Sequence, residues 1–369
     1  EELQGRIIRM GYRPQAVRRV YIPKDNGESR PLGLPTIEDK IVQKTMAEVM
    51  EAIYEQDFHE CSYGFRPNRS CHKALKRLNK LINDSPINHV IEADIKGFFD
   101  SVPHEKLMEL VKIRIADKAF LRYIVRFLKS GYIESGVLQQ VSKGTPQGGN
   151  ISPMLANIFL HYVLDEWFEK QIKPHLKGQN HLIRYCDDFV ILVQYKAQGQ
   201  EILQKVRERF KEYGIELNQT KTRMLSFGYW ERENASKQQR RANTFEFLGL
   251  THYCSQTRKG AFKVARKTSA RRFSRSYRAI KIWLKSVRNM VRLKYLWKAL
   301  QIKLMGYYQY YGVSDNLRSL IKFYRAILRL VYKWVNRRSQ KRSFNWEQFT
   351  QYLKRYPLPK PRIVYSFYD

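Results

Sequence analysis

Hydrophobic positions along the chain repeat with two different periods, and the change between them divides the sequence into two parts. Up to about residue 253, apolar runs typical of strands occur between stretches that have the 3.6-residue period of a helix. Beyond residue 268 the periodic stretches are helical, basic and rich in Tyr and Trp. The pattern therefore predicts an α+β part over residues 1–253 and an all-helical part over residues 254–369.

The same periodicity assigns individual elements to the first part. Strands are expected at residues 17–22, 89–95, 181–185 and 189–193. Helices are expected at residues 39–53, 71–81, 103–111 and 152–170, with Ser70 as the N-cap of the second one. Polar composition favours a turn at residues 25–27 and an exposed loop at residues 229–243.

Charge follows the same division. Lys and Arg number 68 against 34 Asp and Glu, so the formal net charge is +34. Residues 255–369 hold 29 of these cations and only three acids, which leaves +8 for residues 1–254. A run of charge is usually a solvated face, but a surplus of +26 in one segment repels itself unless a polyanion binds. We therefore expect a nucleic acid as the partner of the second part.

Several classes of protein are not expected from the composition. No apolar run approaches the ~18 to 20 residues of a membrane span, and no apolar signal-peptide core is present, so we expect a soluble, unsecreted protein without a membrane partner. The four cysteines form no CxxC pair, so neither a zinc site nor a disulfide scaffold is expected. Because the sequence begins with Glu rather than Met, we expect part of the natural N-terminus to be missing.

Acidic residues end two of the predicted apolar strands. Glu92 and Asp94 share one face of the first strand, and Asp187 and Asp188 lie where a hairpin would turn. Carboxylates on apolar strands need a counter-charge, and Mg²⁺ is the cation that carboxylates and substrate phosphates suit. Two such ions can activate a 3′-hydroxyl and stabilise a leaving pyrophosphate. The alternative is a pair of solvated turn acids beside an unrelated aspartate.

Motifs around these acids resemble those of a known family. Tyr185-Cys-Asp-Asp188 resembles the Tyr-x-Asp-Asp box of reverse transcriptases, and residues 94–104 (DIKGFFDSVPH) resemble the box that supplies their third carboxylate. Further blocks resemble the remaining family motifs and follow in the family's order, at residues 21–36, 62–70, 144–153, 214–222 and 245–250. The resemblance spans nearly the whole chain.

The residue sequences of the motifs also indicate a subfamily. RPLGLPT at 30–36, YGFRP at 63–67 and TPQGGNISP at 145–153 are typical of group II intron-encoded proteins, and residues 336–341 and 357–362 resemble a maturase (X) domain. Two departures are Cys186, where this group more often has Ala, and the absence of much of the N-terminal block of non-retroviral enzymes. Residues 255–369 contain no His and no Cys, so no HNH-type endonuclease is expected there.

The resemblance implies a right-hand polymerase, with fingers and palm over residues 1–253 and a basic helical thumb and maturase X domain over residues 254–369. Asp94, Asp187 and Asp188 would be the catalytic carboxylates that hold two Mg²⁺ ions, with Mn²⁺ a possible substitute and the Ile95 carbonyl a further ligand. The incoming nucleotide would be contacted by Lys24, Arg30, Phe99, Gln147 and Lys221, the last as a partner of a phosphate or of a carboxylate near the active site. Phe99 would exclude the ribose 2′-hydroxyl, and its alternative role is core packing. For Lys24 and Arg30 the alternative is that both are solvated surface cations. For Gln147 it is a plain turn between a strand and a helix.

The implied partners are group II intron RNA, an RNA template, a DNA primer or target DNA, and deoxynucleotides. Candidate RNA-binding residues are Arg271, Arg272, Arg275, Arg278, Arg337, Arg338 and Lys341. The function implied is an RNA-directed DNA polymerase that assists intron splicing and copies the intron, in the bacterial cytoplasm near the nucleoid or in an organelle. Two other readings stay open: a domesticated relative that serves defence or repair, and an RNA-binding maturase that has lost polymerisation.

Overall fold

The structure is a computed structural model that describes residues 2–23, 29–145, 148–338 and 343–368. The chain divides into two compact units, Glu1–Gly228 and Tyr229–Asp369. The mixed helix and sheet content agrees with the expected α+β class. The expected boundary at residue 253 separates domains that are defined by function, whereas this division is defined by compactness. The functional boundary therefore stays a prediction.

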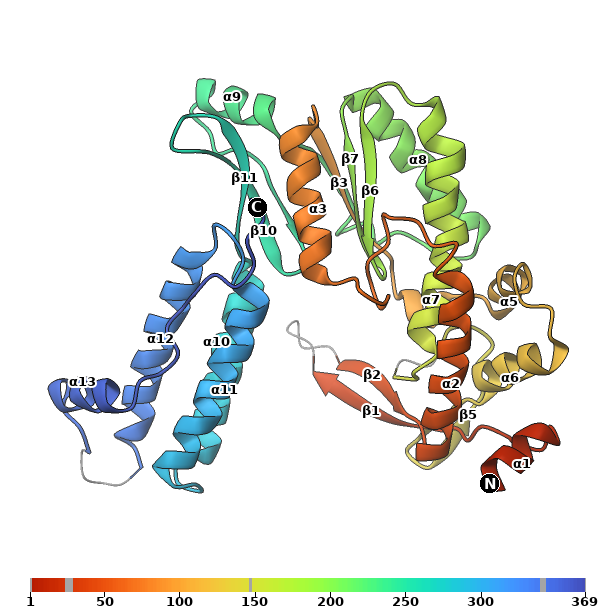
Figure 1. Cartoon of the computed structure of the whole chain (residues 1–369), viewed down its shortest axis with the longest axis horizontal. Coiled ribbons are helices and arrows are strands. Elements are labelled where there is room, and N and C mark those ends of the chain that lie inside the picture. Colours follow the sequence, from red (N-terminus) through yellow and green to blue (C-terminus); the bar gives the residue numbers. More distant parts are fainter. Residues whose placement is uncertain (1, 24–28, 146–147, 339–342, 369) are drawn as a thin grey trace. The chain divides into compact units, whose positions relative to one another are not determined.

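An antiparallel sheet of order β6-β7-β3-β8 carries the predicted carboxylates Asp94 and Asp188 of the first unit (Figure 1). Its strands are β3 (His89–Asp94), β6 (Asn180–Tyr185), β7 (Asp188–Val193) and β8 (Arg223–Ser226). Helix α3 (Cys71–Asp84) contacts β6, and helix α8 (Lys196–Glu212) contacts β3 and β7. The central strands are covered on both faces, which explains their nearly continuous apolar sequence. The Ser70 hydroxyl accepts a hydrogen bond from the Lys73 backbone at 3.2 Å, so the expected N-cap of α3 is confirmed.

A second sheet of the first unit has the order β2-β1-β4-β5. Its strands are β1 (Val17–Pro23), β2 (Ser29–Leu34), β4 (Tyr132–Glu134) and β5 (Val137–Gln139). The expected turn at residues 25–27 lies outside the described residues. The remaining helices of this region are α1 (Glu2–Ile8), α2 (Ile37–Tyr54), α4 (Phe98–Ser101), α5 (His104–Lys112) and α6 (Lys118–Lys129). Helices α2, α5 and α6, together with α7 described below, bury their apolar faces in one hydrophobic core.

The helix expected at residues 152–170 is not a continuous α-helix. It begins as α7 (Ser152–Leu160) and continues through the π-helical turns η1 (His161–Asp165) and η2 (Phe168–Ile172) to a short 3₁₀ turn, η3 (Lys173–His175). The Glu166 backbone N–H donates to the His161 carbonyl, which is the i→i+5 hydrogen bond of a π turn. Periodicity predicted the length of this segment but not the change in winding.

The second unit combines a sheet with a helical region. Its sheet has the order β11-β10-β9, with β9 (Thr244–Phe247), β10 (Leu250–Gln256) and β11 (Phe262–Thr268). The helices are α9 (Tyr229–Lys237), α10 (Ala270–Val287), α11 (Leu293–Tyr311), α12 (Leu317–Val335) and α13 (Trp346–Arg355). Because β10 ends after residue 253 and β11 follows it, the expectation that residues 254–369 are all-helical was wrong.

Two polar segments account for the differences in this unit. Strand β11 carries Lys263, Arg266 and Lys267, so its sequence does not show the alternation of apolar and polar residues that is typical of a strand. The Arg266 side chain is nevertheless buried, and its guanidinium lies 4.8 Å from the centre of the Phe367 ring. Residues 229–243 were expected to form an exposed loop, but they contain α9. Glu231 of that helix is buried and accepts a 2.6 Å hydrogen bond from the exposed Arg240, so this polar sequence contains a charge that the fold covers. In the part of the chain that the structure describes, no helix is long and apolar enough to cross a membrane.

Candidate active site

Strand register brings two of the predicted carboxylates opposite each other. Asp94 is the last residue of β3, and Asp188, the first residue of β7, is its partner in the antiparallel ladder. Directly opposed residues of such a pair project from the same face of the sheet and lie close together. Tyr185 of β6 also pairs with Asp188, so only Cys186 and Asp187 form the turn between β6 and β7.

The turn has an unusual backbone at its first residue. Cys186 has a φ of 60°, which is the left-handed region that a two-residue hairpin normally fills with glycine. Its side chain is buried, and burial raises the pKa of the Cys186 thiol to about 12. The thiol is therefore neutral near pH 7, and it adds no charge beside Asp187 and Asp188.

Asp94 is also held from the segment before β8. Lys221 donates a 2.7 Å hydrogen bond to Asp94 Oδ2, and Asn218 Nδ2 donates to the same oxygen at 3.3 Å. The Asn218 backbone N–H donates to the Asp94 carbonyl at 2.8 Å. Lys221, expected to contact a phosphate or a carboxylate, thus lies at a carboxylate of this site.

The donor set suits the hard divalent cation that the sequence implies. No three His, Cys, Asp or Glu side chains among the described residues are gathered closely enough to form a metal-binding cluster. Mg²⁺, however, is usually bound through one or two protein carboxylates plus water and substrate phosphates. The opposed pair Asp94 and Asp188, with Asp187 one residue away, provides such ligands at one sheet edge. Ile95 follows directly, with a buried side chain and a backbone that bridges to Leu217.

The predicted nucleotide contacts are only partly described. Phe98 is buried in the core, whereas Phe99 is half-buried and packs edge-on against the Phe98 ring at 5.5 Å. The Thr145 backbone N–H donates to the Phe99 carbonyl at 2.6 Å, so the segment that leads to Gln147 lies beside Phe99. Lys24 and Gln147 themselves lie outside the described residues. The Arg30 backbone pairs with Ile22 in the β1–β2 ladder, and its side chain lies outside the described part.

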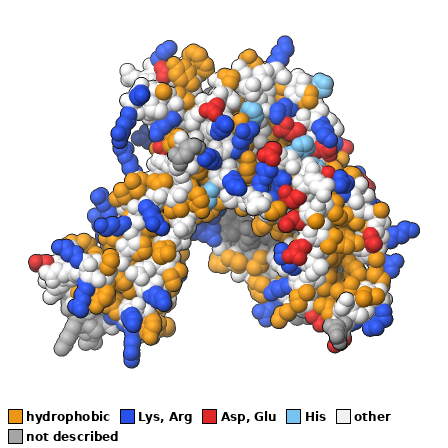
Figure 2. Space-filling model, in the orientation of Figure 1, with side chains coloured by type: hydrophobic (Ala, Val, Ile, Leu, Met, Phe, Trp, Pro, Cys, Tyr) orange, Lys and Arg blue, Asp and Glu red, His pale blue; other side chains and the backbone are white. Residues whose placement is uncertain are grey.

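The predicted RNA-binding residues lie in the second unit. Helix α10 exposes all four of its candidate arginines, at positions 271, 272, 275 and 278. Arg337 is exposed near the Trp334 ring, but Arg338 donates to the Val291 carbonyl at 2.8 Å, which gives it a structural contact. Lys341 lies outside the described residues. On the face seen in Figure 2, the surface over α10 to α12 shows lysine and arginine side chains and few acids.

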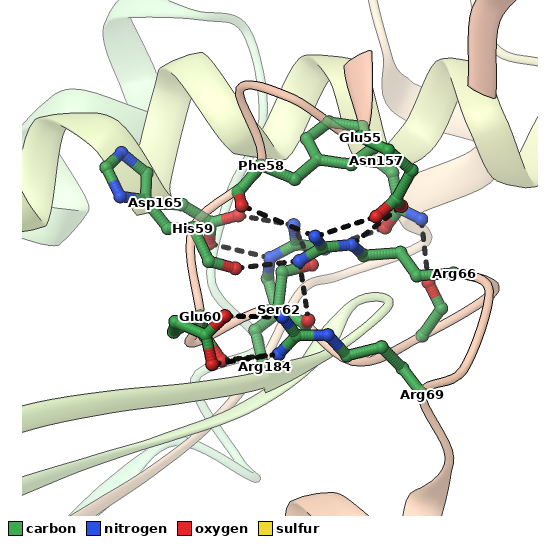
Figure 3. A network of polar contacts seen from close by, with 11 residues as sticks. Glu55, Phe58, His59, Glu60, Ser62, Arg66, Arg69, Asn157, Asp165 and Arg184 are labelled. Carbon is green, nitrogen blue, oxygen red and sulfur yellow. Dashed lines mark hydrogen bonds and ion pairs between the residues drawn. The ribbon is translucent and has the colours of Figure 1, made fainter. Parts of the chain in front are cut away.

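A buried polar network behind the turn was missed from the sequence (Figure 3). Its centre is Arg184 of β6, which is fully buried with Asp165 of η1. Burial acts most strongly and lowers the pKa of Arg184, but the charge and hydrogen bonds of Asp165, together with weaker neighbours, leave the pKa raised overall, so the guanidinium stays charged. One available signal was a charge in the middle of the apolar run Leu182-Ile-Arg-Tyr185, because a charge on a buried strand requires a buried partner.

Comparison with known proteins extends this picture. A family model described as "Reverse transcriptase (RNA-dependent DNA polymerase)" matches residues 22–252. Protein YkfC of Escherichia coli strain K12 is 36% identical over 252 residues, which cover 60% of this chain and 66% of that protein. Group II intron-encoded protein LtrA of Lactococcus lactis subsp. cremoris is 46% identical over 151 residues, which cover 41% of this chain and 25% of that protein.

The fold has solved counterparts as well. The structure of apo telomerase from Candida tropicalis matches 92% of this chain and 61% of that chain, with a TM-score of 0.52 and 16% sequence identity. At that identity the match shows a shared fold alone. The alignments with YkfC and LtrA span 66% and 25% of the length of those two relatives.

Proposed function

Because the chain belongs to the reverse transcriptase family, we propose that it is an RNA-directed DNA polymerase that serves a group II intron. The observation that carries this proposal is the β3–β7 register, which sets Asp94 opposite Asp188 beside the Tyr185–Asp188 turn. In a chain that matches the family over residues 22–252, this is the place where polymerase carboxylates are needed.

In this proposal, residues 1–253 act as fingers and palm and residues 254–369 as thumb and maturase X domain. Asp94, Asp187 and Asp188, with the Ile95 carbonyl, hold two Mg²⁺ ions, for which Mn²⁺ can substitute. These ions supply activation of the primer 3′-hydroxyl and stabilisation of the leaving pyrophosphate. Phe99 blocks the position of a 2′-hydroxyl, and Lys221 moves from Asp94 to a substrate phosphate. Lys24, Arg30 and Gln147 complete the nucleotide contacts.

The intron-related part of the proposal rests on kinship and charge. LtrA, by its name, is a group II intron-encoded protein, and it shares 46% identity over the matched residues. The second unit adds exposed arginines on α10, which suit the phosphates of a structured RNA. We propose that this surface, with Arg337, Arg338 and Lys341, binds intron RNA and that binding assists splicing.

Primer extension tests the polymerase. The purified chain, an RNA template with an annealed DNA primer, deoxynucleotides and Mg²⁺ should give DNA product, and chelation of Mg²⁺ should stop it. Asp94→Asn should extend at least about a hundredfold more slowly, because a metal ligand is removed. Glu92→Gln, which changes an acid two residues earlier on the same face of β3, is the matched control and should extend normally. Absence of product from the native chain would refute polymerase function.

A splicing assay tests the intron association. A group II intron RNA should bind more tightly than an unrelated structured RNA of equal length, and it should splice faster with protein at low Mg²⁺. Equal binding of both RNAs, with polymerisation intact, would instead favour a domesticated enzyme in defence or repair. RNA-specific binding without polymerisation would favour a maturase alone.

A further inference from the structure

The Arg184 guanidinium touches the backbone of the turn that carries the carboxylates. Its Nη1 donates to the Cys186 carbonyl at 3.0 Å and to Asn157 Oδ1 at 3.0 Å. Its Nη2 donates to Ser62 Oγ at 2.8 Å and to Asp165 Oδ2, and its Nε donates to Asp165 Oδ1 at 2.7 Å. All five N–H donors of the side chain are therefore used, and one holds the turn.

The π turn of η1 brings two of these acceptors together. Asn157 lies in α7, and Asp165, eight residues later, is the last residue of η1. In a regular α-helix, residues eight apart lie ~80° apart around the axis. The i→i+5 hydrogen bond of η1 puts more residues into one turn, which reduces this angle. The side chains of Asn157 and Asp165 therefore both contact the Arg184 guanidinium. The irregular winding thus serves the contact with Arg184.

The segment at residues 61–64 also contacts this turn. The Arg184 backbone pairs with the segment before Gly64, through hydrogen bonds to the Cys61 carbonyl at 2.8 Å and from the Tyr63 N–H at 2.9 Å. Gly64 then lies against the turn so closely that a Cβ there would be 2.5 Å from the Cys186 nitrogen. Asn157 ties this segment to the network, because its Nδ2 donates to the Gly64 carbonyl at 2.7 Å.

These contacts converge on the residue with the least favourable backbone. Cys186 is held at a φ of 60° without being glycine, and such a conformation persists only where surrounding contacts over-determine it. The contacts here are the hydrogen bond to its carbonyl and the close approach of Gly64 to its nitrogen. Asp187 and Asp188 are the next two residues, so the backbone conformation of Cys186 determines the positions of both carboxylates.

We propose that Arg184, fixed by Asp165 and Asn157, is a positioning residue that holds the Cys186–Asp187 turn in the geometry that binds divalent metal. The proposal rests on the proposed polymerase function for its catalytic consequence. Its direct consequence is metal affinity, since partners that orient metal-binding carboxylates typically contribute 10- to 100-fold.

The same part of the structure provides a matched control. Arg66 is also buried and also uses five hydrogen bonds, to both Glu55 oxygens and to the carbonyls of Phe58, His59 and Ser62. None of those five goes to the turn, although the two guanidinium groups lie near each other in Figure 3. Loss of Arg66 therefore disturbs a second buried network that reaches the turn indirectly, through the segment around Ser62, and it leaves the hydrogen bond from Arg184 to Cys186 in place.

The experiment compares full-length Asp165→Asn, Arg184→Lys and Arg66→Lys with the native chain. Mn²⁺ is the probe, and its binding without nucleic acid is measured by the EPR signal of free Mn²⁺, with Asp188→Asn identifying the site. Asp165→Asn and Arg184→Lys should weaken Mn²⁺ binding by about tenfold or more and lower kcat by a similar factor. RNA affinity should stay within about twofold, because the RNA contacts lie elsewhere. Arg66→Lys should lower the melting temperature without changing Mn²⁺ affinity.

Asn157→Ala keeps the proposal testable if the charged variants do not fold. It removes one acceptor of Arg184 and the link to Gly64, and it should weaken Mn²⁺ binding by a smaller factor than Asp165→Asn. Native Mn²⁺ affinity in folded Asp165→Asn or Asn157→Ala would overturn the proposal, as would an equal loss in Arg66→Lys. A native chain that fails to extend primers would refute the polymerase instead, while the Mn²⁺ measurement would still decide the role of Arg184.

Discussion

The two units handle charge in opposite ways. In the first unit, Asp94 and Asp188 lie opposite each other on β3 and β7, and the fully buried Arg184 donates a hydrogen bond to the Cys186 carbonyl in the β6–β7 turn. In the second unit, the arginines of α10 lie exposed along one helix that has only two buried side chains, Ile280 and Leu284. One set of charges is positioned by backbone register and buried hydrogen bonds, whereas the other projects into solvent.

This difference separates two kinds of function. A carboxylate set by strand register can be placed to within a fraction of an ångström, which catalysis requires. An arginine exposed on a helix contributes its charge to the affinity for a polyanion, and this does not require the side chain to be placed as closely as a catalytic group. Substitutions in the first unit should therefore act on rate, and substitutions on α10 should act on binding.

The largest effect is expected from the turn itself. Asp187→Ala should reduce primer extension by about a thousandfold, because the several kcal/mol that a metal ligand contributes to the transition state disappear with it. Its RNA affinity should stay near the native value, since an acid opposes phosphate. Filter binding beside primer extension measures both quantities. Extension above about a tenth of the native rate would remove Asp187 from the site.

The next effect concerns the exposed cations. Replacing Arg271, Arg272, Arg275 and Arg278 with Gln should weaken RNA binding and flatten its salt dependence. The log-log slope should fall by roughly 0.7 to 0.9 for each phosphate that these arginines no longer neutralise. Extension on a saturating short primer–template should survive. An unchanged slope in a well-folded variant would place the RNA on another surface. A parallel fall in both activities with a lower melting temperature would make these arginines structural.

A smaller effect is expected at the edge of the nucleotide site. Phe99→Val should reduce discrimination between deoxynucleotides and ribonucleotides by about tenfold, because a smaller side chain leaves room for a 2′-hydroxyl. The measurement is the ratio of kcat/KM for the two substrates. Phe98→Leu is the control, since that ring is buried in the core. An unchanged ratio in Phe99→Val would show that the half-buried ring only packs against Phe98.

The smallest effect is a pH dependence of the second unit. His252 of β10 is buried against the Phe245 ring, and burial lowers its pKa to about 3. An unfolded His has a pKa near 6.5, so its stabilising contribution is complete above ~6.5 and is lost progressively as pH falls towards 3, by up to ~1.4 kcal/mol per pH unit. His252→Phe should remove this part of the acid sensitivity.

Denaturation followed by tryptophan fluorescence checks this, because Trp167 is the only tryptophan outside the second unit. Between pH 7 and pH 5 the native chain should lose more stability than His252→Phe. Equal losses in the two proteins would show that His252 becomes protonated without unfolding the sheet.

Local pattern in the sequence predicted much of the sheet that carries Asp94 and Asp188. Strands β3 and β7 are apolar runs with an acid at one end, so periodicity predicted that they exist, whereas the resemblance to family motifs implied that Asp94 and Asp188 lie close together. The membership in the reverse transcriptase family, with kinship to group II intron-encoded proteins, is confirmed. These features depend on short-range periodicity and on contiguous motifs, which a single sequence displays.

The parts that were missed depend on contacts between distant residues. Arg184 contacts Ser62, Asn157 and Asp165, which are distant in the sequence and come together only in the folded chain. The periodicity of apolar residues likewise does not indicate that η1 is a π turn. Strand β11 and helix α9 were hidden because Arg266 and Glu231 are buried charges, which a polarity pattern reads as exposed. Polar sequence is thus an unreliable guide to exposure wherever the fold buries a charged side chain.

The most direct test of the proposed active site is the rate of one nucleotide addition in a preformed complex. Native protein, Asp188→Asn and Glu92→Gln are each bound to an RNA template with a DNA primer, and Mg²⁺ and one deoxynucleotide are then added by rapid mixing. We expect equal amounts of complex, a native rate for Glu92→Gln, and a rate at least about a thousandfold lower for Asp188→Asn. A native rate for Asp188→Asn would contradict the assignment of catalysis to the β3–β7 edge.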